Sequence, residues 1–194
     1  AMPEKEIETF CPTSSQEWRQ WLQENHLSKS SIWLVQYKVK SGKPSISWSE
    51  AVDQALCFGW IDSTKKSMDH ETFIQFFCPR KPKSVWSKIN KAKVQNLIAE
   101  GLMTPAGYAS IEIAQKNGSW NTLDEAEALT IPADLEAGFA AQPGSKDSFL
   151  GLSKSAQKTM LQWLILAKQP VTRQKRIGEI VERAMQKLKP KQLG

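Results

Sequence analysis

Residues 31–40 restrict the fold most, because large apolar side chains occupy every second position from 33 to 39. One face of this segment carries Trp33, Val35, Tyr37 and Val39, which is the pattern of a half-buried β-strand. An apolar run at 72–78 predicts a second strand, and residues 60–68 predict an extended segment that reaches it through a turn at 69–71. Together these segments predict a small antiparallel sheet of about three strands.

Helical patterns flank the strands and then replace them. Ser14 and Ser47 are each followed three residues later by glutamate, a capping-box signature that predicts helices over 14–25 and 47–59. Further along the chain the apolar spacing is helical, and the predicted helices span about 87–101, 104–118, 132–141, 153–168 and 172–188. The predicted fold class is therefore α+β, a small sheet with flanking helices followed by a helical C-terminal region.

A chain of 194 residues is long enough to bury a core without disulfides or metals. We predict a mixed α+β domain over 1–120 and a helical region over 121–194 packed on it; the alternative is one continuous domain. The acidic stretch 121–136 and the Gln-Pro-Gly-Ser sequence at 142–145 are the best candidates for linkers.

Composition argues against several classes of protein. No apolar stretch approaches the roughly 18 residues of a membrane span, and the charged residues 4–8 do not resemble the apolar core of a signal peptide. The three cysteines, at positions 11, 57 and 78, form no paired pattern, so we expect free thiols in a reducing compartment. The expected protein is cytoplasmic and does not insert into membranes.

The formal net charge of +6 is unevenly distributed. Residues 80–100 contain six Lys/Arg and one Glu, and residues 168–191 contain eight Lys/Arg and two Glu. The intervening residues 101–151 contain two Lys and seven acids. This distribution predicts basic patches, although lysine and arginine also collect at helix C-termini for reasons of the helix dipole.

Four sequence blocks together identify a family. They are ALCFGWID at 55–62, PRKPKSVWSKIN at 79–90, GLMTPAG at 101–107 and TRQKRI at 172–177. With these blocks the chain resembles the YdeI/OmpD-associated, or bacteriocin-protection, family over nearly its whole length. The resemblance implies a role in tolerance of bacteriocins or envelope stress, and the family name implies association with an outer-membrane porin. It supplies no catalytic residue, substrate or cofactor.

Residues 79–91 form the strongest candidate site, because cations, hydroxyl groups and an indole alternate where a strand leads into a helix. The predicted ligand contacts in this segment are Arg80, Lys83, Ser84, Trp86, Ser87, Lys88 and Asn90. Cations next to the N–H groups of a helix start favour an anion, and Trp86 offers a face for stacking a base or a sugar. The alternative interpretation is a capping serine, a core Trp86 and solvated lysines. The sequence leaves both open.

Four further residues are expected to support this site, namely Trp60, Asp62, Arg173 and Arg176. Asp62 is either a partly buried carboxylate that faces the basic segment or a side chain that fixes a turn. Arg173 and Arg176 lie in the first turn of the last predicted helix, where cations oppose the helix dipole. We therefore expect a compensating partner, either an acidic residue from 124–136 or an anion shared with the basic segment.

The sequence predicts no metal and no cofactor, since two isolated histidines and three scattered cysteines lack ligand spacing. Nucleotide-binding and hydrolase motifs are missing as well, and Cys57 lies among apolar neighbours, as a buried, inert thiol does. The preferred function is a non-catalytic binding or regulatory protein with an electropositive site for an anion, such as a nucleotide, a phosphorylated metabolite or nucleic acid. One alternative is a dedicated nucleic-acid-binding protein, which the isoelectric point of about 9.2 allows. The other is a small-molecule enzyme with Asp62 as acid or base.

Overall fold

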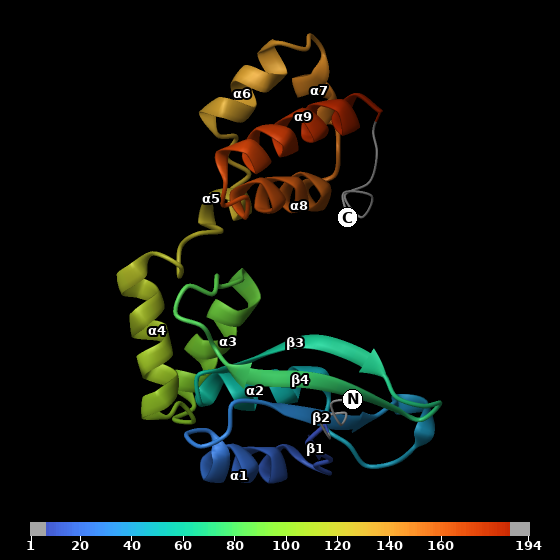
Figure 1. Ribbon diagram of the computed structural model, residues 1–194, viewed down its shortest axis with the longest axis vertical. Coiled ribbons are helices and arrows are strands. Elements are labelled where there is room, and N and C mark those ends of the chain that lie inside the picture. The colour runs from blue at the N-terminus through green and yellow to red at the C-terminus, as the bar shows by residue number, and fades with distance from the viewer. Residues whose placement is uncertain (1–6, 187–194) are drawn as a thin grey trace, which may run out of the picture. The chain divides into compact units, whose positions relative to one another are not determined.

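The computed structural model describes residues 7–186, and the chain forms two compact units (Figure 1). The first unit consists of the residues up to Ser84 together with Ile89–Trp120. The second consists of Val85–Lys88 together with the residues from Asn121 onward. The division therefore passes through the basic segment in which the sequence predicts a site.

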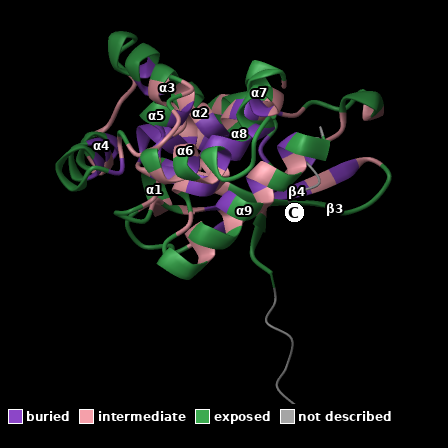
Figure 2. Cartoon of the chain, turned by 90° about the horizontal axis from the view of Figure 1, so that it is seen from above, coloured by how far each residue is buried: buried purple, intermediate pink, exposed green. Residues whose placement is uncertain are grey.

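The first unit contains the whole sheet. Its elements in chain order are β1 (Thr9–Phe10), α1 (Ser15–Asn25), β2 (Ile32–Tyr37), the 3-10 turn η1 (Val39–Ser41), α2 (Trp48–Cys57), β3 (Trp60–Ser67), β4 (Thr72–Pro79), α3 (Lys88–Ala99) and α4 (Pro105–Asn117). The strand order is β1-β2-β4-β3, with β4 antiparallel to both β2 and β3. β3 is thus an edge strand, and most of its length is exposed (Figure 2).

Helices α1 and α2 cover one face of this sheet. Trp18 of α1 is fully buried, lies edge-on to Phe77 of β4 at 5.2 Å between ring centroids, and donates its indole N–H to the carbonyl of Ala51 in α2 at 2.9 Å. Leu34 and Gln75 are cross-strand partners on the same face and are also buried. Burial of these large side chains is the main stabilisation of the unit.

Two of the recognised sequence blocks meet where α2 ends. Thr104 caps α4 and donates its hydroxyl to the carbonyl of Cys57 at 2.6 Å. A Cβ on Gly107 would lie 2.5 Å from that same carbonyl oxygen, and a Cβ on Gly59 would lie 2.9 Å from the carbonyl oxygen of Ala106. Glycine is therefore required at 59 and 107, because the two backbones approach too closely for any side chain.

The α+β class is confirmed, but the sheet has four strands rather than three and is mixed rather than purely antiparallel. The additional strand β1 pairs parallel to β2 through Thr9 and Phe10, and two residues are too few to show an alternating pattern. The strand expected over 31–40 ends at Tyr37, since the chain turns through η1 into Gly42, whose φ is +69°.

The second unit is helical. Its elements in chain order are α5 (Asp124–Glu127), α6 (Ala133–Ala140), α7 (Ser145–Leu150), α8 (Lys154–Ile165) and α9 (Pro170–Gln186). The buried core includes Leu135 and Phe139 of α6, Phe149 of α7 and Leu164 of α8, packed with Ile180 of α9. The predicted end of the last helix at 188 and the basic residues 187–191 lie outside the described residues.

Between residues 7 and 186, no helix combines the length and the hydropathy that a membrane-spanning segment requires.

Candidate functional site

Asp62 joins three elements of the first unit. Its Oδ2 accepts a hydrogen bond from the Nε2 of Gln75 on β4 at 2.7 Å and one from the Nε1 of Trp48 on α2 at 3.0 Å. Gln75 is buried, so the inner of these bonds is shielded from water. Both partners are side chains of other elements rather than the backbone of a turn, and the role of Asp62 as a carboxylate that faces the basic segment stays a prediction.

Arg80, which directly follows β4, has a largely buried guanidinium. Its backbone N–H donates to the carbonyl of Gly59 at 2.8 Å, which anchors the chain at this point. Burial lowers the pKa of Arg80 from its ordinary value to about 10, and the negative charge of Asp62 opposes that change only in part. Arg80 therefore stays protonated at neutral pH, with less stabilisation of its charge than water would provide.

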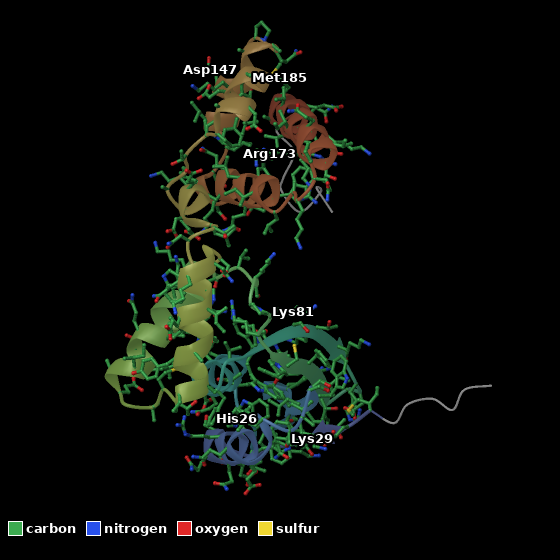
Figure 3. All side chains as sticks on the ribbon, turned by 60° about the vertical axis from the view of Figure 1, so that its left-hand side comes forward. His26, Lys29, Lys81, Asp147, Arg173 and Met185 are labelled. Atoms are coloured by element: carbon green, nitrogen blue, oxygen red, sulfur yellow. The ribbon has the colours of Figure 1, made fainter. Side chains whose placement is uncertain are left out.

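Three lysines of the basic segment extend into solvent. Lys81, Lys83 and Lys88 are exposed, and none of them takes part in an ion pair within residues 7–186; Lys81 lies beside the strands of the first unit (Figure 3). Lys81 and Lys83 belong to the first unit with Arg80, whereas Lys88 belongs to the second. We define Arg80, Lys81 and Lys83 as the Arg80 cluster.

Other cations of the same segment have internal partners. Lys91 donates to the carbonyl of Trp120 at 2.9 Å and lies over its ring. Lys93 forms an ion pair with Asp53 of α2 at 2.7 Å. Part of the charge excess over 80–100 thus serves the internal structure of the first unit.

The two predicted tryptophans are buried. Trp60 and Trp86 are each 1% exposed, and Trp60 lies edge-on to Trp21 and donates its indole N–H to the carbonyl of His26 at 3.4 Å. Ser84, Ser87 and Asn90 are partly exposed. Stacking of a ligand on Trp86 stays a prediction, and it would require this ring to become accessible.

Arg173 and Arg176 each have a partner within the second unit. Arg173 forms two hydrogen bonds with Asp134 of α6, one of them from Nη2 to Oδ1 at 2.9 Å, and this ion pair raises the pKa of Arg173 and lowers the pKa of Asp134. The guanidinium of Arg176 lies 4.8 Å from the ring centroid of Trp163. An acidic partner from 124–136 was one of the two expectations for Arg173; an anion shared with the basic segment stays a prediction.

The sequence analysis missed a groove at one end of the sheet in the first unit, where β2 and η1 lead into α2. This α2 groove has a volume of about 500 Å³, and its lining includes Tyr37, Val39, Lys43, Ser45, Trp48 and Phe73. The available signal was Trp48 itself, which directly follows the capping serine and is therefore placed at a helix end rather than in the middle of a buried face.

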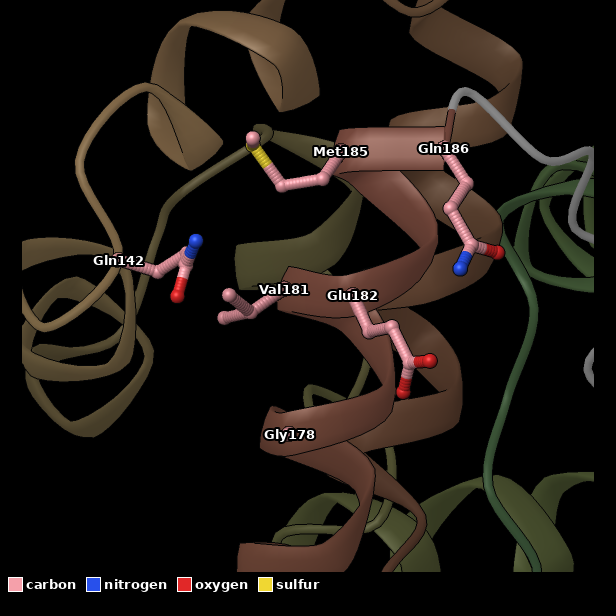
Figure 4. Close-up of a pocket in the computed structure, with 6 residues that line it drawn as sticks. All are labelled: Gln142, Gly178, Val181, Glu182, Met185 and Gln186. Atoms are coloured by element: carbon pink, nitrogen blue, oxygen red, sulfur yellow. The ribbon is translucent and has the colours of Figure 1, made fainter.

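The second unit has a shallower hollow beside α9, with a volume of about 320 Å³. Gln142 and Val181 point toward one another across it, and Met185 lies one turn further along the helix (Figure 4). Among the described residues, Glu182 is the only charged group that lines it.

The cysteines have no catalytic surroundings. Cys57 is fully buried, and burial raises the pKa of its thiol, which disfavours the reactive thiolate. Within the described part of the chain, no group of three or more His, Cys, Asp or Glu side chains is arranged to hold a metal ion.

The fold and these sites define an α+β protein with a sheet-containing unit and a separate helical unit, and two family models match them in turn. Residues 10–110 match the model described as a domain of unknown function (DUF8412), and residues 128–187 match the model described as Bacteriocin-protection, YdeI or OmpD-Associated (OmdA). The chain therefore belongs to the DUF8412 family over more than half its length, and its second unit carries the YdeI/OmpD-associated match, which confirms the suspected family. Comparison with curated proteins and with solved structures found no match.

The four sequence blocks, which were expected to belong to one family, are divided between the two family matches. The block at 172–177 lies inside the YdeI/OmpD-associated match, whereas those at 55–62, 79–90 and 101–107 lie inside the DUF8412 match. Arg173 and Arg176 are therefore the only predicted site residues within the YdeI/OmpD-associated region.

Proposed function

We propose that the protein is a non-catalytic binding protein that holds a small anion at the Arg80 cluster. The observation that supports this most is the charged guanidinium of Arg80, held in a largely buried position beside the exposed Lys81 and Lys83. Arginine is well suited to such a site because its planar fork binds carboxylate and phosphate through paired hydrogen bonds. The family description supplies the setting, which is tolerance of bacteriocins or envelope stress, and we place the protein in the cytoplasm.

The local balance of charge favours an anion. The charge of Asp62 counteracts part of the effect of burial on Arg80, and the Oδ2 of Asp62 also accepts hydrogen bonds from Gln75 and Trp48. Its charge is therefore shared between those donors and the guanidinium. A bound anion would restore part of the stabilisation that Arg80 loses on burial, and the two lysines would attract it from solution.

A thermal-shift titration tests the proposal. Pyrophosphate added at low ionic strength should raise the melting temperature, because a ligand that binds only the folded state stabilises it. The double variant Lys81→Ala/Lys83→Ala should lose most of this shift. The control variant is Lys116→Ala, which removes an exposed lysine of α4 that pairs with Glu112. Equal shifts in the double variant and in the control would reject the Arg80 cluster as the site.

A nucleic-acid-binding function is the second candidate, and exposed lysines on the edge strand β3 favour it. Lys65 and Lys66 belong to the same unit as Lys81 and Lys83 and are likewise exposed. Fluorescence polarisation of labelled DNA and RNA at several salt concentrations separates this function from small-anion binding. A linear fall of log K with log salt would count the phosphate contacts, and absence of binding at low salt would leave the small anion.

An enzyme that uses Asp62 as acid or base has less support. Its Oδ2 accepts hydrogen bonds from two N–H donors, which hold the carboxylate in place. This arrangement suits a fixed acceptor better than a group that exchanges protons with a substrate.

A further inference from the structure

We propose a second ligand site in the α2 groove, for a flat aromatic or heteroaromatic molecule that carries one acidic group. This site is separate from the Arg80 cluster, because Arg80, Lys81 and Lys83 do not contribute to the lining of the groove. Its volume of about 500 Å³ lies in the range of small-molecule sites.

The lining is unusually apolar for an exposed part of the surface. Trp48 is 50% exposed and Val39 is 99% exposed, although residues of these types normally contribute to a core. Phe73 of β4 adds a second ring to the lining. The strand register pairs Phe73 with Gln36 and Tyr37 with Thr72, so the ring of Tyr37 lies on the other face of the sheet. Trp48 and Phe73 therefore provide the aromatic surface against which a planar molecule can pack.

Trp48 is held in place before any ligand arrives. Its Nε1 donates to Asp62 at 3.0 Å, and Asp62 is in turn held by the buried Gln75 at 2.7 Å. A solvent-exposed indole without such support would lose rotational freedom when a ligand stacked on it. Because the hydrogen bonds restrict this ring already, less conformational entropy is lost on binding.

One cation next to the groove is available to an acidic group on the ligand. Lys65 lies 4.3 Å from the ring centroid of Phe73, which lines the groove, and it has no ion-pair partner within residues 7–186. Two charged groups line the groove itself, and each of them already has partners. Lys43 pairs with Glu71 at 2.7 Å, and Glu50 accepts bonds from Ser15 and from the backbone of the capping serine before α2.

The N-terminus of α2 also favours an acidic group on the ligand. The partial positive charge of the helix dipole is located at this end, next to the exposed ring of Trp48. The sequence predicts a tryptophan, a helix start and a lysine together at 79–91; the same combination occurs here, with an accessible ring.

Saturation-transfer NMR on the full chain tests the site with three matched pairs of probes. The pairs are nicotinate with nicotinamide, indole-3-acetate with indole-3-acetamide, and adenosine monophosphate with adenosine. At least one acid should bind, and its uncharged counterpart should bind about threefold more weakly, as loss of one exposed charge pair implies. No signal from any of the six compounds would overturn the proposal, and so would equal binding within every pair.

Variants locate the binding. Trp48→Ala should weaken it at least about tenfold, as loss of a stacking ring does. Lys65→Ala should reduce the acid to the affinity of its uncharged counterpart. The matched control is Lys66→Ala, since Lys66 lies over Trp33 at 5.1 Å instead of over Phe73. Binding that survives Trp48→Ala in a folded variant would overturn the site, and so would equal losses from Lys65→Ala and Lys66→Ala.

Failure of this site and failure of the proposed function are distinguishable. The Lys81→Ala/Lys83→Ala variant should lose its response to pyrophosphate and keep its affinity for the aromatic acid. If it also lost the aromatic acid, the two sites would not be separate, and the proposal of a second site would be wrong.

Discussion

Replacement of Asp62 tests whether this carboxylate acts as an inward-facing acceptor and as a neighbour to the charge of Arg80. In Asp62→Ala, the buried Nε2 of Gln75 loses its partner, which costs about 1–3 kcal/mol. The bond from the half-exposed Trp48 adds up to about 1 kcal/mol. We therefore expect the free energy of unfolding of the first unit to fall by about 1–4 kcal/mol.

Asp62→Asn is the matched comparison, because an amide oxygen can accept both hydrogen bonds while the negative charge is removed. We expect it to cost only about 1 kcal/mol, mainly because the pKa of Arg80 falls further without the neighbouring carboxylate. Urea denaturation followed by circular dichroism measures both values. If both variants lost the same free energy of unfolding, the negative charge of Asp62 would be its stabilising property, and its hydrogen-bond acceptor would contribute nothing. A loss below about 0.5 kcal/mol in both would refute the structural role altogether.

Three further predictions concern single residues. Gly178→Ala should stabilise the second unit by about 0.5–1 kcal/mol, because a Cβ there meets nothing and alanine favours a helix. Gly138→Ala should destabilise it by about 1 kcal/mol, because its Cβ would lie 2.7 Å from a methyl group of a buried isoleucine in α9; urea melts in which both variants shift the same way would contradict this. The pKa of Asp134 in the folded protein lies below its ordinary value of 3.8 because of Arg173. The ion pair therefore stabilises the folded state fully at pH values above 3.8, and this stabilisation is lost as the pH falls through the lower pKa of the folded state. In Arg173→Gln, the free energy of unfolding from urea melts should change less with pH between about pH 2 and about pH 5. The same change with pH as in the wild type would contradict this role of the ion pair. Cys57 should resist iodoacetamide in the native protein and react after denaturation, because burial raises its pKa and shields the thiol; rapid native labelling, read by mass spectrometry, would contradict the packing around α2.

The elements that the sequence predicted best are those whose signals are local. Ser47 and Glu50 form both bonds of a capping box at α2, and Thr104 with Pro105 starts α4 as expected. The signature at Ser14 predicted the start of α1 correctly, but the carboxylate of its partner glutamate bonds to Thr13 instead. Capping depends on a few neighbouring residues, so sequence alone identifies it.

The elements that the sequence analysis missed are short. β1 has two residues, and α5 and α7 have four and six, so none of them repeats its pattern of apolar residues often enough to be recognised. Such segments gain their structure from neighbours in space, for example the pairing of Thr9 with Trp33. No local pattern records these long-range contacts.

In the candidate site, too, the burial and pairing of side chains depend on long-range contacts that local sequence does not record. Trp60 and Trp86 are buried while Trp48 is half exposed, and the one local difference is the capping serine that directly precedes Trp48. Similarly, Lys93 pairs with Asp53 across 40 positions of the chain, whereas Lys83 stays in solvent. A cluster of lysines in sequence therefore indicates where a basic surface begins, but tertiary packing determines which cations are available to a ligand.

Isothermal titration calorimetry with pyrophosphate tests the central claim, anion binding at the Arg80 cluster, most directly. The wild-type protein should release heat and saturate at one equivalent, with an affinity that weakens as salt is raised. The Lys81→Ala/Lys83→Ala variant should bind at least about tenfold more weakly, while Lys116→Ala should match the wild type. Undetectable binding to the wild-type protein at low salt, or the same affinity in all three proteins, would contradict the account.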